Sequence, residues 1–139
     1  MSGARILYVD DERPVLIMFK LLMRSLGYAC EAVDSPRDAI ERFQAAPYAY
    51  DLVITDFLMP EMDGNELARQ LMEIRPEIPV IVLTGSPDSA DRREAYRLGV
   101  RAYLEKPVDR SLLAGVINDV LANRPGDEIT PAHALGAGL

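Results

Sequence analysis

Cysteine and histidine are almost absent from this sequence, which contains one residue of each among 139. The single cysteine, Cys30, excludes an internal disulfide and any Cys-x-x-Cys metal or redox site. The one histidine, His133, lies in a C-terminal segment rich in Pro, Gly and Ala. That position argues against histidine acid–base catalysis, a His-rich metal site and a phosphohistidine within the folded part.

Long apolar runs are also absent, since no stretch approaches the roughly 18 residues that span a bilayer. Residues 15–26 come closest, but Lys20 and Arg24 interrupt them. The N-terminus lacks the charged start, apolar middle and small-residue cleavage site of a signal peptide. We therefore expect a cytoplasmic protein with no membrane partner.

The chain also lacks an excess of basic residues, since its net charge is −7. A nucleic-acid binder usually carries a basic face that neutralises phosphates, so we expect no direct nucleic-acid binding. Some basic residues do cluster along the chain, and they could form either a partner surface or a solvated helix face. They are Arg92, Arg93, Arg97, Arg101, Lys106 and Arg110.

What the chain does contain is a strict alternation of strand and helix patterns. The apolar runs predict strands at about 4–9, 28–33, 51–55, 79–84 and 101–105. The intervening segments predict helices at about 14–26, 36–45, 64–75, 88–98 and 109–123. Helix boundaries are marked by Ser35-Pro36 and Asp109 at N-termini and by Gly27 and Gly99 at C-termini.

This alternation predicts an α/β fold with one open, five-stranded parallel sheet and helices on both faces. The first, third and fourth strands are continuous apolar runs, as expected of strands buried on both faces. Ligands bind to such sheets at the point where the strand order reverses, and in the order 2-1-3-4-5 strands one and three flank that point. We expect one domain over residues 1–123 and a flexible C-terminal tail over residues 124–139.

Several of these strands end on an oxygen-bearing or amino side chain: Asp10 and Asp11, Asp56, Thr84 and Lys106. Parallel strands end at one edge of a sheet, so these groups should share one pocket. Any one of them could be a helix cap or turn residue. Together they predict a pocket for Mg²⁺, in which Asp56 forms an aspartyl phosphate while Thr84 and Lys106 contact the phosphoryl group.

Other phosphate-binding motifs do not fit the sequence. No glycine begins a P-loop, and the Gly-x-Gly-x-x-Gly pattern of dinucleotide-binding folds is absent. The first strand is followed by Asp-Asp-Glu, which does not match the Asp-x-Asp-x-Thr of haloacid-dehalogenase-type phosphatases. An aspartyl-phosphate phosphatase would also need an insertion long enough to cover its substrate, and none is present.

Four segments resemble the receiver domain of two-component response regulators. They are YVDDE (8–12), DLVITDFLMPEMDG (51–64), VIVLTG (80–85) and YLEKP (103–107), and the likeness extends over roughly residues 4–123. The resemblance implies a flavodoxin-like receiver fold. It also implies that Asp56 accepts a phosphoryl group from the phosphohistidine of a sensor histidine kinase or phosphotransfer protein, so that the chain is a phosphoryl acceptor rather than an enzyme with a separate substrate.

The resemblance also implies how the site residues divide their roles. Asp11, Asp56 and the backbone carbonyl of Leu58 would bind Mg²⁺ directly, with Asp10 acting through water. Thr84 and Lys106 would contact the phosphoryl group, and the Lys106–Pro107 peptide is expected to be cis. Thr84 would move toward the phosphoryl group and leave room for Tyr103 to turn inward. That change would reshape the face of the fourth helix, fifth strand and fifth helix, which would bind a downstream protein.

Two features are particular to this chain. Leu58 and Ser86 lie two residues after Asp56 and Thr84, at positions that gate water in this family, and the apolar Leu58 predicts slow loss of the phosphoryl group. The first helix is unusually apolar, and Val15 and Met18 are candidates to contact a kinase or phosphotransfer helix. The chain shows no output domain, so we expect a stand-alone receiver, the receiver of a hybrid histidine kinase, or part of a DNA-binding regulator.

Overall fold

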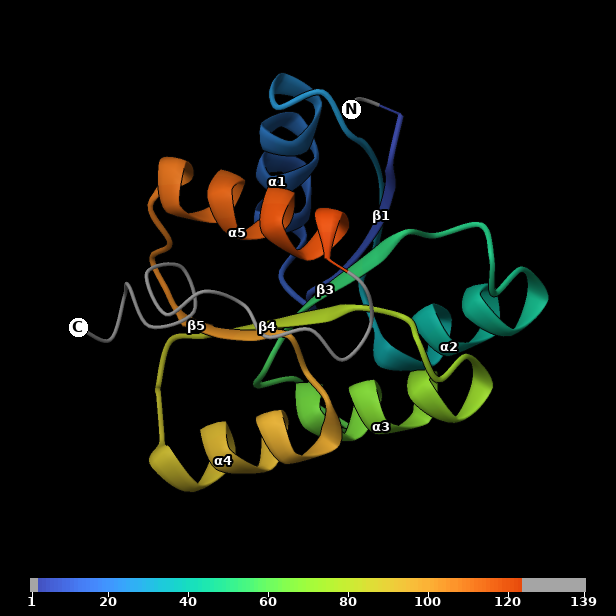
Figure 1. The fold of residues 1–139 in the computed structure, drawn as a ribbon, viewed down its shortest axis with the longest axis vertical. Coiled ribbons are helices and arrows are strands. Elements are labelled where there is room, and N and C mark those ends of the chain that lie inside the picture. Colours follow the sequence, from blue (N-terminus) through green and yellow to red (C-terminus); the bar gives the residue numbers. More distant parts are fainter. Residues whose placement is uncertain (1–2, 124–139) are drawn as a thin grey trace.

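The computed structural model describes residues 3–123, and within them five strands alternate with five helices (Figure 1). Every boundary lies within one residue of its prediction. The elements are β1 (Arg5–Val9), α1 (Arg13–Ser25), β2 (Ala29–Val33), α2 (Pro36–Ala45), β3 (Leu52–Asp56), α3 (Gly64–Ile74), β4 (Val80–Thr84), α4 (Ser89–Leu98), β5 (Ala102–Glu105) and α5 (Arg110–Ala122).

The five strands form one parallel sheet in the order β2-β1-β3-β4-β5, which confirms the predicted topology. Strands β1 and β3 are neighbours at the centre, yet the chain leaves them toward opposite sides of the sheet. Their carboxyl ends therefore border the point where the strand order reverses, and ligands bind at such points in open α/β sheets.

Helices cover both faces of the sheet, with α1 and α5 on one side and α2, α3 and α4 on the other (Figure 1). Each face has its own apolar cluster, because alternate residues of the central strands point to opposite sides. All five residues of β3 and of β4 are buried, as their continuous apolar sequences predict. The edge strand β2 is only partly buried.

The helix boundaries follow from caps that the sequence contains. The Ser35 hydroxyl accepts a hydrogen bond from the Asp38 amide at 3.1 Å, and the Asp109 carboxylate accepts one from the Leu112 amide at 3.0 Å. Asp109 is thus the N-cap itself, and α5 begins one residue later than predicted. Gly27 and Gly99 adopt φ angles of 93° and 110° after their helices, where a side chain would be strained.

Helix α4 covers the outer edge of the sheet at β5. The Arg92 guanidinium donates a hydrogen bond to the Tyr103 carbonyl at 3.2 Å, and the Tyr96 hydroxyl accepts one from the Tyr103 amide at 3.0 Å. Both main-chain groups of Tyr103 are therefore satisfied by side chains of α4. The two side chains thus provide the hydrogen bonds that a neighbouring strand would otherwise provide at this edge of the sheet.

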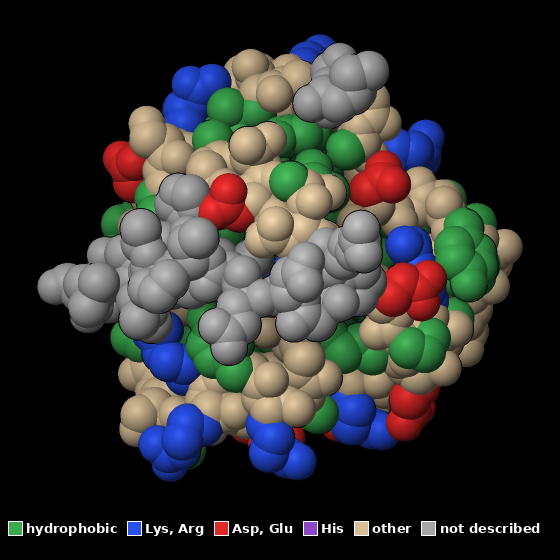
Figure 2. All heavy atoms as spheres, in the orientation of Figure 1, with side chains coloured by type: hydrophobic (Ala, Val, Ile, Leu, Met, Phe, Trp, Pro, Cys, Tyr) green, Lys and Arg blue, Asp and Glu red, His purple; other side chains and the backbone are tan. Residues whose placement is uncertain are grey.

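Three of the basic residues between 92 and 110 have partners within the fold. Arg92 contacts β5, Arg97 pairs with Glu94 on the same helix at 2.8 Å, and Arg110 donates to the Ser25 hydroxyl at 3.0 Å. Figure 2 shows acidic and basic side chains close together on the right of the face in view and mainly basic ones along its lower rim. Local contacts of this kind are those expected of a solvated helix face.

No helix within residues 3–123 has both the length and the apolar character that a membrane crossing requires. The predicted tail over residues 124–139, including His133, lies outside the described residues. The partly buried Cys30 lies on β2, and burial raises the pKa of its thiol to about 11, as for an inert core thiol.

Candidate phosphoryl-acceptor site

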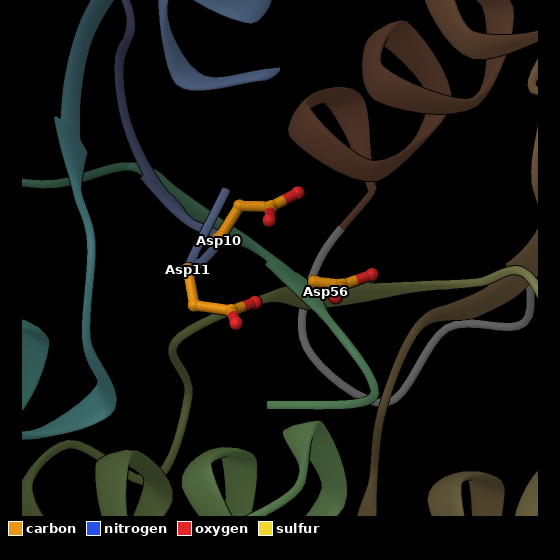
Figure 3. A group of neighbouring side chains, drawn as sticks. All are labelled: Asp10, Asp11 and Asp56. Atoms are coloured by element: carbon orange, nitrogen blue, oxygen red, sulfur yellow. The ribbon is translucent and has the colours of Figure 1, made fainter. Parts of the chain in front are cut away.

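Three carboxylates lie together at the carboxyl end of the sheet (Figure 3). Asp10 and Asp11 follow β1, and Asp56 is the last residue of β3. One oxygen from each residue lies within 4.8 Å of the other two. Carboxylate oxygens at this spacing suit a hard divalent cation such as Mg²⁺ or Ca²⁺.

Asp10 is completely buried, and each of its oxygens has a partner. Oδ1 accepts a hydrogen bond from the Glu12 amide at 3.0 Å. Oδ2 accepts one from the Tyr8 hydroxyl at 2.8 Å and lies 3.6 Å from the Lys106 ammonium. Burial, followed by the Asp10 charge, raises the pKa of Tyr8, so the phenol remains a protonated donor.

Lys106 reaches into the same site from the residue after β5. Its ammonium lies 2.6 Å from Asp56 Oδ1, and its amide donates to the Thr84 carbonyl at 2.7 Å. The Lys106–Pro107 peptide is cis, as the resemblance implies. Burial, the largest single cause, lowers the pKa of Lys106, but the hydrogen bond to Asp56 and the charges of Asp56, Asp10 and Glu12 together outweigh it, so that pKa is raised.

The negative charge of Asp56 is disfavoured in this arrangement. Burial raises the pKa of Asp56, Lys106 opposes that shift, and the charges of Asp10 and Asp11 add to it. Three carboxylates against one ammonium leave a formal excess of two negative charges. A divalent cation would balance that excess, which is the chemical reason for expecting one here.

The open side of the site is a cleft between the ends of β1, β3 and β4 and the start of α4. Thr84 is 1% exposed at its edge, and its hydroxyl accepts a hydrogen bond from the Ser86 amide at 3.1 Å. The Leu58 side chain is 72% exposed at the rim. The lining also includes Asp11, Glu12, Asp56, Phe57, Met59, Pro60, Gly85, Asp91 and Lys106.

Gly64, at the start of α3, lies against the backbone of Asp56 and Phe57, a contact that was not predicted from the sequence. A Cβ atom at this position would lie 2.7 Å from the Asp56 carbonyl oxygen and 3.1 Å from Phe57 Cα. The Gly64 amide donates to the Phe57 carbonyl at 2.7 Å. Only a residue without a side chain permits this approach. The only sequence signal was a glycine at the predicted start of a helix, at residue 64.

Tyr103, the aromatic residue of the predicted switch, is fully buried in this structure. The ring packs edge-on against Phe57 at a centroid distance of 6.0 Å, and the Arg92 guanidinium lies 5.3 Å from its centre. These two contacts favour the inward position.

The two candidate contact residues on α1 lie in different environments. Met18 is 70% exposed and lies beside the exposed Ile17 and Leu21, so it is available to a partner. Val15 instead packs against the buried cluster between α1, α5 and the sheet. Val15 is partly buried, so less of its side chain than of Met18 is available to a partner.

Known proteins provide an independent view of this fold and site. The model of the response regulator receiver domain matches residues 6–118. The transcriptional regulatory protein GlrR of Escherichia coli (strain K12) is 35% identical over 118 residues, covering 85% of this chain and 26% of GlrR. The phosphate regulon transcriptional regulatory protein PhoB of Pseudomonas aeruginosa is 30% identical over 139 residues, covering 98% and 60%.

Solved structures agree with the sequence relatives. A response regulator receiver domain protein from Clostridium thermocellum has a TM-score of 0.82 at 33% identity, over 85% of this chain and 94% of that one. A CheY-like receiver domain protein from Methanospirillum hungatei has a TM-score of 0.80 at 28% identity, over 86% and 94%. The chain spans about a quarter of the length of GlrR. By its sequence, its sheet order and its relatives, the chain belongs to the family of response regulator receiver domains.

Proposed function

We propose that the chain accepts a phosphoryl group on Asp56 from the phosphohistidine of a sensor histidine kinase or phosphotransfer protein. The observation that carries the proposal is the 2.6 Å contact between the Lys106 ammonium and Asp56, within a group of three carboxylates. A nucleophile, a cation site and a fixed positive donor are thereby combined in one cleft. Phosphoryl transfer to a carboxylate needs these three elements.

In the proposed reaction an Asp56 oxygen attacks phosphorus while the bond from phosphorus to the histidine nitrogen breaks, and the imidazole leaves. Lys106 and the Thr84 hydroxyl donate hydrogen bonds to the phosphoryl oxygens. When Mg²⁺ is bound, it neutralises negative charge on the phosphoryl oxygens. Asp11, Asp56 and the Leu58 carbonyl would hold the ion, and Asp10 would contact it through water because both its oxygens already have protein partners.

The proposed output is a change in the face formed by α4, β5 and α5, which binds a downstream protein. A phosphoryl group on Asp56 attracts the Thr84 hydroxyl and so stabilises the state in which Tyr103 lies inward. This is a shift between existing conformations, because the phosphoryl group favours only the state whose donors reach it. Arg92 and Tyr96, which bond the Tyr103 backbone, connect that state to α4.

We further propose that the described residues act on protein partners rather than on nucleic acid. The curated relatives are named transcriptional regulatory proteins, and the chain spans only part of their length. Two of the arginines near β5 have partners within the fold, since Arg92 donates to the Tyr103 carbonyl and Arg97 pairs with Glu94. On this proposal the chain is a phosphoryl acceptor without a separate substrate, located in the cytoplasm with the kinase's catalytic part.

The test is incubation with a small phosphodonor such as acetyl phosphate and Mg²⁺, followed by measurement of the intact mass. The wild-type chain should gain the mass of one phosphoryl group, and Asp56→Asn should gain none. Glu41→Gln, an exposed carboxylate substitution on α2, is the matched control and should behave like the wild type. A phosphoryl group that persists on Asp56→Asn would show that the acceptor is a different residue.

A further inference from the structure

A buried phenol contacts the carboxylate cluster from inside the protein. Tyr8 lies on β1 two residues before Asp10, so both side chains point to the same face of the sheet. The Tyr8 hydroxyl donates to Asp10 Oδ2 at 2.8 Å, and both residues are at most 1% exposed. The proposed chemistry at Asp56 does not use this phenol directly.

The Tyr8 ring is fixed by helix α1. It stacks on the Phe19 ring with a centroid distance of 3.7 Å and an interplanar angle of 4°. Phe19 is 8% exposed, whereas the adjacent Met18 is 70% exposed on the outer side of the same helix. A continuous line of contacts therefore leads from α1 through Phe19 and Tyr8 to Asp10.

A tyrosine that merely fills the core would need only some acceptor for its hydroxyl. Here the acceptor is a member of the carboxylate cluster, and the contact determines where that carboxylate points. Without the phenol, the only remaining partner of Asp10 Oδ2 would be the Lys106 ammonium at 3.6 Å. Asp10 would then turn toward Lys106 and compete with Asp56 for it.

We infer that Tyr8 is a positioning residue of the metal site, which holds Asp10 in its place and connects that place to α1 through Phe19. The inference rests on the proposed function, because it concerns the cation that Asp10, Asp11 and Asp56 would share. Hydrogen-bond partners of metal-site groups orient those groups, and their loss typically weakens metal binding by about 10- to 100-fold.

The experiment is calorimetric titration of the unphosphorylated chain with Mg²⁺. Tyr8→Phe keeps the ring and removes only the hydroxyl, and its Kd for Mg²⁺ should rise about tenfold. Phe19→Leu keeps an apolar side chain and removes the stacking, and its Kd should rise by a smaller factor. Tyr50→Phe is the matched control, since the Tyr50 hydroxyl donates to the Glu31 carboxylate at 2.7 Å, outside the site. Its Kd should equal that of the wild type.

The outcomes separate this inference from the proposed function. A wild-type chain that binds no Mg²⁺ would overturn the metal site and, with it, the role of Tyr8. Normal binding by the wild type with a Tyr8→Phe Kd within twofold, or equal weakening in Tyr50→Phe, would overturn the inference alone. Urea unfolding of each variant shows whether it is folded. If Tyr8→Phe is not folded, Phe19→Leu provides the test, and a Kd for Mg²⁺ within twofold of the wild type would overturn the inference.

Discussion

The Lys106 ammonium lies 2.6 Å from Asp56 Oδ1, so the proposed acceptor and the proposed phosphoryl-binding cation form an ion pair with each other. Acceptance of a phosphoryl group requires this pair to separate and the ammonium to move onto a phosphoryl oxygen. The pair therefore orients the acceptor and also occupies one of its oxygens. The ammonium and a bound cation would both neutralise the carboxylates of this cleft, so they compete for the same negative charge.

Lys106→Gln should separate the two effects of this ammonium. Loss of the positive charge should slow phosphoryl acceptance by about 100-fold, comparable to removing one transition-state donor. Mg²⁺ binding should instead become about tenfold tighter, because the ammonium no longer neutralises the carboxylates. Acetyl phosphate kinetics and calorimetry measure the two changes. Weaker Mg²⁺ binding in this variant would contradict the charge argument.

Asp56→Asn should stabilise the metal-free protein at neutral pH. Burial raises the pKa of Asp56 above its ordinary value of 3.8, so the folded state binds this proton more tightly than the unfolded chain. The ionised residue therefore destabilises the fold at pH 7, and that cost disappears as the pH falls below about 4. In EDTA at pH 7 the Tm should rise by a few degrees.

The electrostatic origin of this stabilisation can be checked by comparing the Tm of Asp56→Asn and the wild type at acid pH. Below pH 4 the Tm difference between Asp56→Asn and the wild type should shrink toward zero, provided that both remain folded. Glu41→Gln should show no difference at either pH, because its carboxylate is exposed. An equal gain for Asp56→Asn at both pH values would mean that the stabilisation is not electrostatic.

Gly64→Ala should displace the acceptor. The added Cβ would lie 2.7 Å from the Asp56 carbonyl oxygen, a backbone atom that cannot move alone. Overpacking of this kind costs about 1–3 kcal/mol. Urea unfolding measures that cost, and acetyl phosphate kinetics should show slower acceptance. Gly85→Ala is the steric control, since nothing lies within 4 Å of its Cβ position.

Leu58→Asn should shorten the lifetime of the aspartyl phosphate. The Leu58 side chain is 72% exposed at the rim of the cleft and offers no hydrogen bond to an attacking water. An amide at this position can orient such a water, so phosphate loss should become several-fold faster. Loss of the added mass over time gives the rate. An unchanged or slower rate would refute the role assigned to Leu58.

Met18→Gln should affect the partner and not the fold. Met18 is 70% exposed, and surface substitutions usually change stability by less than about 0.5 kcal/mol. Phosphotransfer from a histidine kinase or phosphotransfer protein should slow, while phosphorylation by acetyl phosphate should be unchanged. Tyr48→Gln, which replaces another exposed apolar residue at 75% exposure, is the control. Equal slowing with acetyl phosphate would place the effect in the site itself.

The sequence predicted the sheet well because its signals are local. Continuous apolar runs identify buried strands, and Ser35, Gly27 and Gly99 mark helix ends without knowledge of any distant contact. The grouping of Asp10 with Asp56 then follows from topology alone, since parallel strands end at one edge. These steps need only the order of residues along the chain.

The features that were missed depend on contacts between distant segments. Gly64 matters because α3 begins against the backbone of Asp56, and Tyr8 matters because its ring meets Phe19 on α1. Neither proximity is encoded in a local pattern. The partial burial of Val15 could not be predicted either, because the sequence of an apolar helix does not show which of its apolar residues face the core.

The contacts between α4 and β5 have a consequence for solubility. An uncovered edge strand can pair with a strand of another molecule and begin aggregation. Arg92 and Tyr96 prevent this at Tyr103 by occupying its carbonyl and amide. The protection lasts only while α4 stays in place. If the proposed signalling moves α4 away from β5, the backbone groups of Tyr103 become free to pair with a strand of another molecule.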